Sequence, residues 1–273
     1  MAAFAGNSLL CRLALKRMSI DPASFTLIRI LSGTIALWLI LKLRRRPKRA
    51  AGSWLSALAL FAYAAAFSFA YVNLPAGTGA LLLFAAVQAT MILGGLRQGE
   101  QLHARQWIGL MLASGGLVLL LFPGLSTPPI IGSILMLSAG AAWGIYSLRG
   151  KAVDGPANAT AGNFLRALPM AALLSIALLP WAQFDRAGVV CAVISGALTS
   201  GVGYVLWYAV LPGLKATSAA TVQLSVPVLA AVGGILFLGE SVTLRFLVSS
   251  VAVLSGIALV VIEQRQRTII ATN

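Results

Sequence analysis

Residues 24–49 read SFTLIRILSGTIALWLILKLRRRPKR, an almost uninterrupted apolar run that leads directly into a cluster of Lys and Arg. A helix needs roughly 20 apolar residues to cross a hydrocarbon core about 30 Å thick. Short loops rich in Lys and Arg are retained on the cytoplasmic side of a membrane. The stretch therefore predicts a transmembrane helix that ends in the cytoplasm.

The whole chain has the same character. Of its 273 residues 59% are hydrophobic and only 10% are charged, and the mean hydropathy is +0.93, too apolar for a soluble domain of ordinary composition. We expect an all-α integral membrane protein with ten transmembrane helices and no separate soluble domain. The apolar runs place these helices near 2–17, 24–42, 53–73, 77–96, 106–122, 130–148, 161–180, 188–210, 216–238 and 244–262.

The basic residues predict the orientation of the chain. With both termini in the cytoplasm, the predicted inner loops hold Lys42 to Arg49, Arg97, Arg105, Arg149, Lys151, Lys215, Arg265 and Arg267. Lys16, Arg17, Arg186 and Arg245 are exceptions. No basic region precedes the first apolar run, so we expect no cleavable signal peptide but a short first span, which extends through Arg12 to Arg17 or has its true start upstream. The prediction is a multi-pass protein of the bacterial inner membrane.

The sequence repeats itself about halfway. An offset of 137 residues aligns five pairs: Arg12 with Arg149, Arg29 with Arg166, Phe67 with Tyr204, Tyr71 with Tyr208 and Pro75 with Pro212. Further along the chain, an offset of 140 aligns Gly99-Glu100 with Gly239-Glu240, Arg105 with Arg245 and Gly116 with Gly256. We expect a duplicated five-helix unit over 1–125 and 126–265, followed by a cytoplasmic tail over 266–273. Because five is odd, the second copy enters the membrane inverted, which is typical of transporters that work by alternating access.

These residues resemble the EamA branch of the drug/metabolite transporter superfamily. The resemblance rests on the two Gly-Glu pairs, on the following spans with Gly115-Gly116 and Gly256, and on the opening pattern of Ala5-Gly6-Asn7, Lys16, Pro22, Phe25 and Arg29. It implies a ten-helix exporter of amino acids or related metabolites with a cavity between its halves. No Trp precedes Gly6, whereas Trp143-Gly144 carries that pair in the second half.

Other classes of function are disfavoured. The net charge of +14 lies in loops and not on a face interleaved with aromatic residues, so we expect no nucleic-acid binding. Cys11 and Cys191 lie inside apolar runs, which indicates neither a disulfide nor a metal site. No nucleophile is accompanied by a base and no phosphate-binding loop is present, so we predict no enzyme, no cofactor and no ATP-driven pump.

The acidic residues bear on energy coupling. Asp21, Glu100, Asp154, Asp185, Glu240 and Glu263 all map to loops or helix ends, and His103 maps to a loop. Proton relays in membranes use buried Asp, Glu or His, so we favour facilitated or exchange transport. In each Gly-Glu pair, Gly is expected to end a helix and Glu to pair with a nearby Arg. The glycines between Ser195 and Gly203 predict close approach of two helices.

Polar and aromatic residues within the predicted spans are the candidates for substrate binding: Asn7, Arg29, Tyr63, Gln88, Trp143, Tyr146, Asn163, Tyr204, Tyr208 and Gln223. The alternatives are hydrogen bonds between helices, aromatic residues at the membrane interface and, for Arg29 and its repeat partner Arg166, snorkelling to headgroups. If Arg29 faces a cavity, its guanidinium suits a substrate carboxylate.

The sequence thus predicts a secondary transporter that exports small amphipathic metabolites across the inner membrane. Its partners are a small-molecule substrate and the lipid bilayer, and the sequence leaves a homodimer open. Two alternatives remain: a translocator of lipid-linked sugars or headgroups, and a membrane scaffold that transports nothing.

Overall fold

The computed structural model describes residues 1–43, 51–97, 104–121, 128–151, 155–210, 223 and 225–272, and every regular element in these ranges is helical. The remaining residues carry several predictions that therefore lie outside the described part of the chain. They include the basic cluster 44–49, Gly99-Glu100, His103, Asp154, Pro212, Lys215 and most of the first half of the ninth predicted span.

The helices follow the apolar runs along the chain. The first half holds α1 (Ala2–Arg17), α2 (Pro22–Leu43), α3 (Trp54–Tyr71), α4 (Ala76–Arg97) and α5 (Ala104–Leu121). The second half holds α6 (Ile130–Lys151), α7 (Pro156–Ala177), the short 3₁₀ turn η1 (Leu179–Trp181), α8 (Arg186–Ile194), the π-helical segment η2 (Ser195–Val202), α9 (Gly203–Val210), α11 (Ser225–Leu238) and α12 (Leu244–Thr272). Because α8, η2 and α9 follow one another without a break, they form one continuous rod.

Helix α12 corrects one prediction. It continues to Thr272, so Glu263 lies inside the helix rather than at its end. Residues 266–272 of the predicted cytoplasmic tail are helical, and the cytoplasmic position of this tail stays a prediction. The segment from Glu263 to Arg267 consists of Glu, Gln and Arg. These residues lose little side-chain freedom in a helix and so extend it beyond the apolar run.

The lengths and composition of the helices fit a multi-pass membrane protein. Six helical stretches in the described residues are long and apolar enough to cross a membrane: 22–43, 54–71, 76–94, 130–150, 157–177 and 186–210. Three shorter apolar helices, at 107–120, 225–238 and 244–256, accompany them. The count of ten spans stays a prediction.

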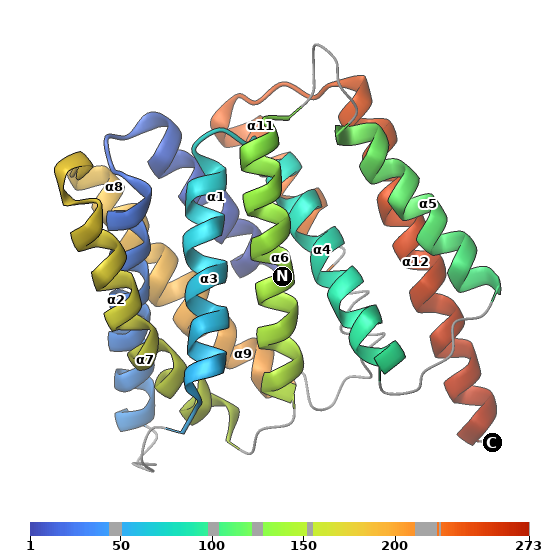
Figure 1. Cartoon of the computed structure of the whole chain (residues 1–273), viewed down its shortest axis with the longest axis horizontal. Coiled ribbons are helices and arrows are strands. Elements are labelled where there is room, and N and C mark those ends of the chain that lie inside the picture. Colours follow the sequence, from blue (N-terminus) through green and yellow to red (C-terminus); the bar gives the residue numbers. More distant parts are fainter. Residues whose placement is uncertain are drawn as a thin grey trace.

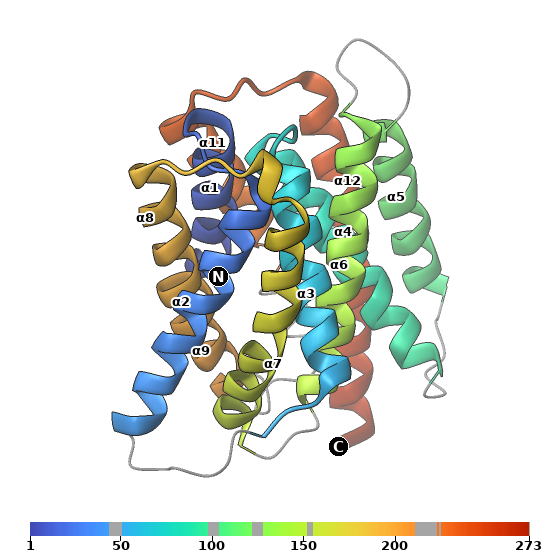
Figure 2. The same ribbon diagram turned by 60° about the vertical axis from the view of Figure 1, so that its left-hand side comes forward.

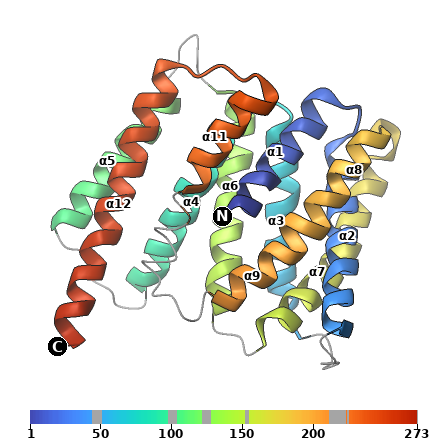
Figure 3. The same ribbon diagram turned by 180° about the vertical axis from the view of Figure 1, so that it is seen from behind.

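The helices run between two ends of the bundle, called here the upper and lower ends as they stand in Figures 1 to 3. Helices α2, α4, α6 and α9 end at the lower end, where α3, α5 and α7 begin. The C-terminus lies at the lower end, whereas the N-terminus lies midway between the ends (Figures 1 and 3). Helix α1 therefore occupies only the upper half of the bundle.

The halves of the chain interlock. Helix α2 packs against α7 and η2, α3 packs against α6 and α7, and α4 packs between α6 and α11, while α1 contacts α8, η2 and α11. Helices α5 and α12 pack mainly against each other and stand to one side of the other helices (Figure 2 shows them from another angle).

The surface of the described residues is largely apolar, and some polar side chains are buried within a mainly apolar interior. Large apolar side chains such as Trp38, Met111 and Phe237 are exposed, whereas the buried residues include Asn7, Arg29 and many Ser and Thr side chains. Polar side chains inside a membrane-embedded bundle face its interior because lipid offers them no partners. This distribution places any polar site between the helices.

Candidate functional site

Arg29 lies at the centre of the interior polar groups. Its side chain on α2 is almost completely buried, at 2% exposure. Nε donates to Ser200 Oγ (3.1 Å), and Nη2 donates to the hydroxyl oxygens of Tyr63 (3.0 Å) and Tyr204 (3.3 Å). The guanidinium carbon lies 5.1 Å from the ring centres of Tyr63 and Phe67, within cation–π range. Its Nη1 is buried without any hydrogen-bond partner.

Asn7 on α1 connects this arginine to the π-helical segment. Its Nδ2 donates to Tyr63 Oη (3.3 Å), and its Oδ1 accepts from Ser195 Oγ (2.6 Å) and Thr199 Oγ1 (3.3 Å). Serine and threonine therefore project from η2 toward both Asn7 and Arg29. π-Helical segments are rare and often mark functional sites, and this one aims three hydroxyls at the buried polar groups.

Glycine lets η2 come close enough to reach Arg29. A Cβ atom added at Gly196 would overlap the carbonyl oxygen of Arg29 and the hydroxyl of Ser32, and one added at Gly33 would overlap the ring of Phe164. The backbones of α2 and η2 are therefore in direct contact at Gly33 and Gly196. The close approach predicted from the glycine-rich run is confirmed at Gly196.

Aromatic rings enclose the other side of this polar centre. The Trp143 ring on α6 lies 4.9 Å from the ring of Tyr63, 4.8 Å from that of Tyr204 and 5.7 Å from that of Phe4. A cavity of about 10 Å³ lies between Trp143, Tyr63, Phe67 and residues of α1 and α4. This volume holds about one water molecule, so the aromatic cage around Arg29 is closed in this conformation.

A larger cavity lies at the lower end. It has a volume of about 250 Å³ and is lined by Gly52, Ser53, Ser56, Tyr146, Arg149, Gly150, Ala159, Thr160, Asn163 and Tyr208. The rings of Tyr146 and Tyr208 meet edge to face at 5.9 Å. Tyr146 is also 5.6 Å from Trp143. Aromatic rings thus connect this cavity with the cage around Arg29.

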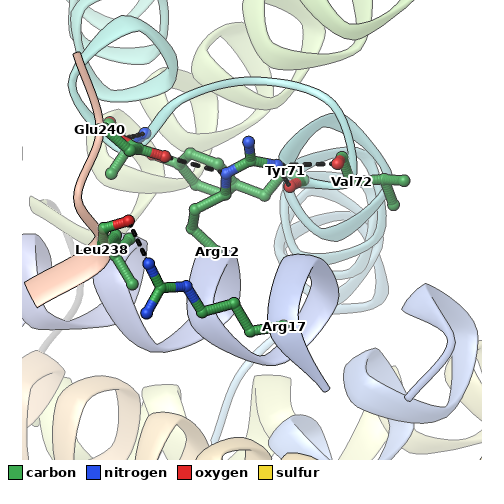
Figure 4. A network of polar contacts seen from close by, with 7 residues as sticks. Arg12, Arg17, Tyr71, Val72, Leu238 and Glu240 are labelled. Carbon is green, nitrogen blue, oxygen red and sulfur yellow. Dashed lines mark hydrogen bonds and ion pairs between the residues drawn. The ribbon is translucent and has the colours of Figure 1, made fainter. Parts of the chain in front are cut away.

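The upper end is tied together by a different set of contacts (Figure 4). Arg12 Nη1 donates to the carbonyl oxygens of Tyr71 (2.9 Å) and Val72 (2.7 Å) at the end of α3. Its Nε donates to Glu240 Oε1 at 3.1 Å, forming an ion pair whose side chains are 6% and 8% exposed. Arg17 donates to the carbonyl oxygen of Leu238. These contacts join α1 and α3 to the end of α11.

Glu240 also holds the start of α4. Its Oε2 accepts from the backbone N–H of Ala76 at 2.8 Å, where the helix dipole favours a negative charge. Gly239 has φ +59°, a left-handed conformation that ends α11. Both parts of the prediction for this Gly-Glu pair are confirmed: Gly ends a helix and Glu pairs with an arginine.

The structure divides the predicted site residues into two groups. Asn7, Arg29, Tyr63, Trp143 and Tyr204 meet in the aromatic cage, while Tyr146, Asn163 and Tyr208 line the lower cavity. The remaining two, Gln88 and Gln223, are buried and are not among the residues that line that cavity. Substrate binding by any of these residues stays a prediction.

Arg29 does not snorkel to headgroups as the alternative interpretation expects, and Arg12 is buried as well. Arg29 and Arg12 are 2% and 5% exposed and donate hydrogen bonds to hydroxyls, carbonyls and one carboxylate inside the bundle, although Nη1 of Arg29 has no partner. Arg166, the repeat partner of Arg29, behaves differently: its Nη1 donates to the carbonyl oxygens of Gly162 (3.0 Å) and Ala51 (3.3 Å). The repeat therefore matches these two residues in sequence but not in environment.

Several residues of the cage and of the lower cavity were not predicted from the sequence. Ser195, Thr199 and Ser200 look like ordinary helix residues, because a π-helical segment has no clear sequence signature. Arg149 looked like a loop charge that sets the orientation, yet it lines the lower cavity. Its match with Arg12 in the repeat was the available signal.

Comparison with known proteins gives one family and several relatives. The sequence model of the EamA-like transporter family matches residues 1–122 and 130–262. An uncharacterized protein of Pseudomonas aeruginosa is 56% identical over 95% of this chain and 91% of its own length. An uncharacterized transporter of Archaeoglobus fulgidus is 26% identical over 97% of this chain and 96% of its own length.

Two further similarities are narrower. The threonine/homoserine exporter RhtA of Escherichia coli is 35% identical, over 50% of this chain and 47% of its own length. A crystal structure aligns with a TM-score of 0.67 over 95% of this chain and 97% of that chain, at 16% identity. At that identity the likeness concerns the fold alone.

Proposed function

The chain belongs to the EamA-like transporter family and is a multi-pass membrane transporter, and from that premise we propose that it exports amino acids or related small metabolites. The proposed mode is secondary transport by alternating access, with the substrate held around Arg29. The orientation proposed from the basic loops places the lower end and the C-terminus in the cytoplasm of a bacterial inner membrane.

The main support for this proposal is the incomplete hydrogen bonding of the Arg29 guanidinium. It is buried among hydroxyls and aromatic rings, and its Nη1 has no partner. A buried charge is costly unless it is paired and fully hydrogen-bonded. A carboxylate that reached Nη1 would supply both the opposite charge and the missing acceptor, and the surrounding rings suit an amphipathic molecule.

The two ends of the bundle support alternating access. At the upper end Arg12 pairs with Glu240, which also lines a cavity of about 280 Å³, and at the lower end a second cavity of about 250 Å³ lies beside Arg149. Helices that correspond in the two halves also make corresponding contacts. Helix α3 packs on α6, and its counterpart, the α8–η2 part of the rod, packs on α1. Likewise α4 packs on α6, and its counterpart α11 packs on α1. This correspondence supports the inverted repeat.

The proposed substrate class draws on one relative. RhtA is named as an exporter of threonine and homoserine, and both of its substrates carry a carboxylate that could bind Arg29. The described part of the membrane interior holds no carboxylate between Arg29 and the lower cavity, and we therefore propose facilitated or exchange transport.

Counterflow in proteoliposomes tests the proposal. Vesicles with purified protein are loaded with unlabelled amino acids and related metabolites, and the uptake of each labelled counterpart is followed. We expect saturable exchange of at least one class of substrate and its loss in Trp143→Ala, which opens the cage but leaves Arg29 in place. Absence of exchange for every compound, with protein shown to be folded, would contradict the proposal and favour a scaffold.

A further inference from the structure

Arg149 gives the lower cavity a positive charge. It lies near the end of α6, where its Nε donates to Ser56 Oγ (3.0 Å) and its Nη2 to Ser53 Oγ (3.3 Å). Ser53 is the N-cap of α3, and its hydroxyl also accepts from the backbone N–H of Ser56. The two serines thus hold the guanidinium at the cavity wall. None of the described residues that line the cavity is acidic.

The rest of the wall offers unused hydrogen-bonding groups. Tyr146 and Tyr208 line the cavity and are each 2% exposed, and neither hydroxyl has a hydrogen-bond partner. A buried polar group without a partner destabilises the protein. A ligand oxygen in the cavity would remove this destabilisation while it also neutralises Arg149. Thr160 and Asn163 also line the cavity, and Asn163 Oδ1 already accepts from the backbone N–H of Ser53 at 3.0 Å.

In the first half of the chain, the position that corresponds to Arg149 is also an arginine, and this arginine binds a carboxylate. Arg12 aligns with Arg149 in the repeat and pairs with Glu240 at 3.1 Å. That interaction is the only ion pair between described residues. The end of the first helix in each half therefore places a guanidinium at the interface of the halves. At the upper end a side chain of the protein supplies the carboxylate.

We propose that the lower cavity is a binding site for the carboxylate of a small organic acid, amino acids included, with Arg149 as its charged ligand. The hydroxyls of Tyr146 and Tyr208 donate to the same ligand. This inference rests on the proposed function, because the cavity would hold the substrate before it reaches Arg29. The packed rings of Tyr146, Trp143 and Tyr204, with centres 5.6 and 4.8 Å apart, connect the cavity with the cage around Arg29.

A monocarboxylate fits the cavity better than a more highly charged oxyanion. The described lining contains one arginine and no lysine, and its volume is about 250 Å³. An arginine binds the two oxygens of a carboxylate in parallel, and the aromatic rings accept an apolar side chain. A divalent phosphate would leave part of its charge unpaired in this surrounding.

Binding to purified protein tests the site independently of transport. Threonine, leucine, phenylalanine and benzoate are each titrated beside the corresponding primary amide, with inorganic phosphate as a separate arm, and thermal unfolding reports binding. At least one acid should stabilise the wild-type protein, and its half-saturating concentration should rise about tenfold or more in Arg149→Gln. The primary amide should bind to the wild-type protein about as weakly as the acid binds to Arg149→Gln.

Matched variants separate the site from general effects. Arg149→Lys keeps the charge but loses the planar fork, so it should bind with intermediate affinity. Arg97→Gln removes an exposed positive charge at the end of α4, also at the lower end, and should bind as the wild type does. Tyr146→Phe keeps the ring and should weaken binding without unfolding the protein.

Several outcomes would overturn the site. Equal binding of acid and amide, unchanged binding in Arg149→Gln, stabilisation by phosphate alone, or no stabilisation by any acid would each do so. Counterflow with the same variants then separates the two proposals. Exchange that is insensitive to Arg149→Gln leaves the transporter and removes the site, whereas Arg149-dependent binding without exchange keeps the site and contradicts the transporter.

Discussion

Arg29 is the residue on which the proposed chemistry depends most. The hydroxyls of Ser200, Tyr63 and Tyr204 bind two of its nitrogens and fix the plane of the guanidinium. The third nitrogen is left without a partner. None of these three side chains is a carboxylate, so within the described contacts the arginine has hydrogen-bond partners but no acidic counter-ion.

Arg29→Gln is expected to abolish saturable exchange, with a loss of about 100-fold or more, because two hydrogen bonds to a charged group are removed from the substrate. The melting temperature should fall only modestly, because the loss of the hydrogen bonds to Ser200, Tyr63 and Tyr204 is partly offset by the removal of a buried charge that has no counter-ion. Counterflow and thermal unfolding on the same preparation check both parts.

Arg166→Gln is the matched control for this substitution. It removes the repeat-related arginine, which bonds to carbonyl oxygens at the start of α7 and before α3 rather than to the cage. Exchange should persist in this variant. If Arg166→Gln and Arg29→Gln reduce exchange equally, the loss reflects a general change in charge and Arg29 is not the carboxylate ligand.

At the scale of single elements, Asp21 connects the start of α2 with the loop before α8. Its Oδ1 accepts from the backbone N–H groups of Ala23 (3.0 Å) and Ser24 (2.9 Å), and its Oδ2 accepts from that of Gln183 (3.0 Å). Burial raises the pKa of Asp21, but the hydrogen bonds from Ser24, Gln183 and Ala23 together lower it by more, so the pKa lies below its ordinary value.

Asp21→Ala should destabilise the protein near neutral pH by about 0.5–2 kcal/mol, the usual effect of losing an N-cap. Because folding lowers the pKa, the stabilisation is fully present above the pKa of about 3.9 in the unfolded chain and disappears as pH falls through the folded value. Thermal unfolding between pH 3 and 8 checks this. A difference from the wild type that persists unchanged at pH 3 would contradict it.

The contact between α2 and η2 gives a second prediction at this scale. Gly196→Ala should lower stability by about 1–3 kcal/mol, the cost of an overpacked contact, because the added methyl group meets the backbone of α2 near Arg29. It should also weaken exchange, since Ser200 and Arg29 would be moved apart. Thermal unfolding and counterflow measure the two effects.

Gly115→Ala on α5 provides the comparison, because nothing lies within 4 Å of the added Cβ atom. Alanine favours a helix over glycine by about 1 kcal/mol, so this variant should be as stable as the wild type or more stable. Equal destabilisation by Gly115→Ala and Gly196→Ala would show that the contact with α2 is not the cause.

At the scale of the whole molecule, the ion pair of Arg12 with Glu240 is expected to hold the upper end closed. Glu240→Gln removes one charge and leaves Arg12 with only carbonyl acceptors, which favours conformations in which the arginine reaches water. Cys11, next to Arg12, is completely buried in the closed form. In a Cys191→Ala background it is the only cysteine, so its labelling reports opening.

A membrane-impermeant maleimide added at the upper end should label Cys11 at least about tenfold faster in Glu240→Gln than in the background protein, since 1.4 kcal/mol of lost closure corresponds to a factor of ten. Asp185→Asn, which alters a carboxylate that caps α8 at the same end, should leave labelling unchanged. Equal protection of Cys11 in both variants would show that the ion pair does not control closure.

The class of this protein and the places of its helices could be predicted from the amino-acid sequence alone. Apolar runs such as 24–42 and 188–210 leave a membrane-spanning helix as the stable state, since only a helix satisfies its own backbone in lipid. Repeated residues such as the Gly-Glu pairs indicated the family, and the polar and aromatic residues inside the runs indicated the interior of the bundle. All of these signals are local in the chain or depend on simple spacing.

The grouping of the polar residues, in contrast, depends on the tertiary structure. Asn7, Arg29, Tyr63, Trp143 and Tyr204 lie on five different helices, and the π-helical segment that joins two of them depends on the contact of Gly196 with α2. The tertiary structure also placed Arg149 at a cavity, and Arg12 beside a carboxylate 228 residues away. Such contacts depend on how helices distant in the sequence pack together. The periodicity of a single helix does not predict that packing.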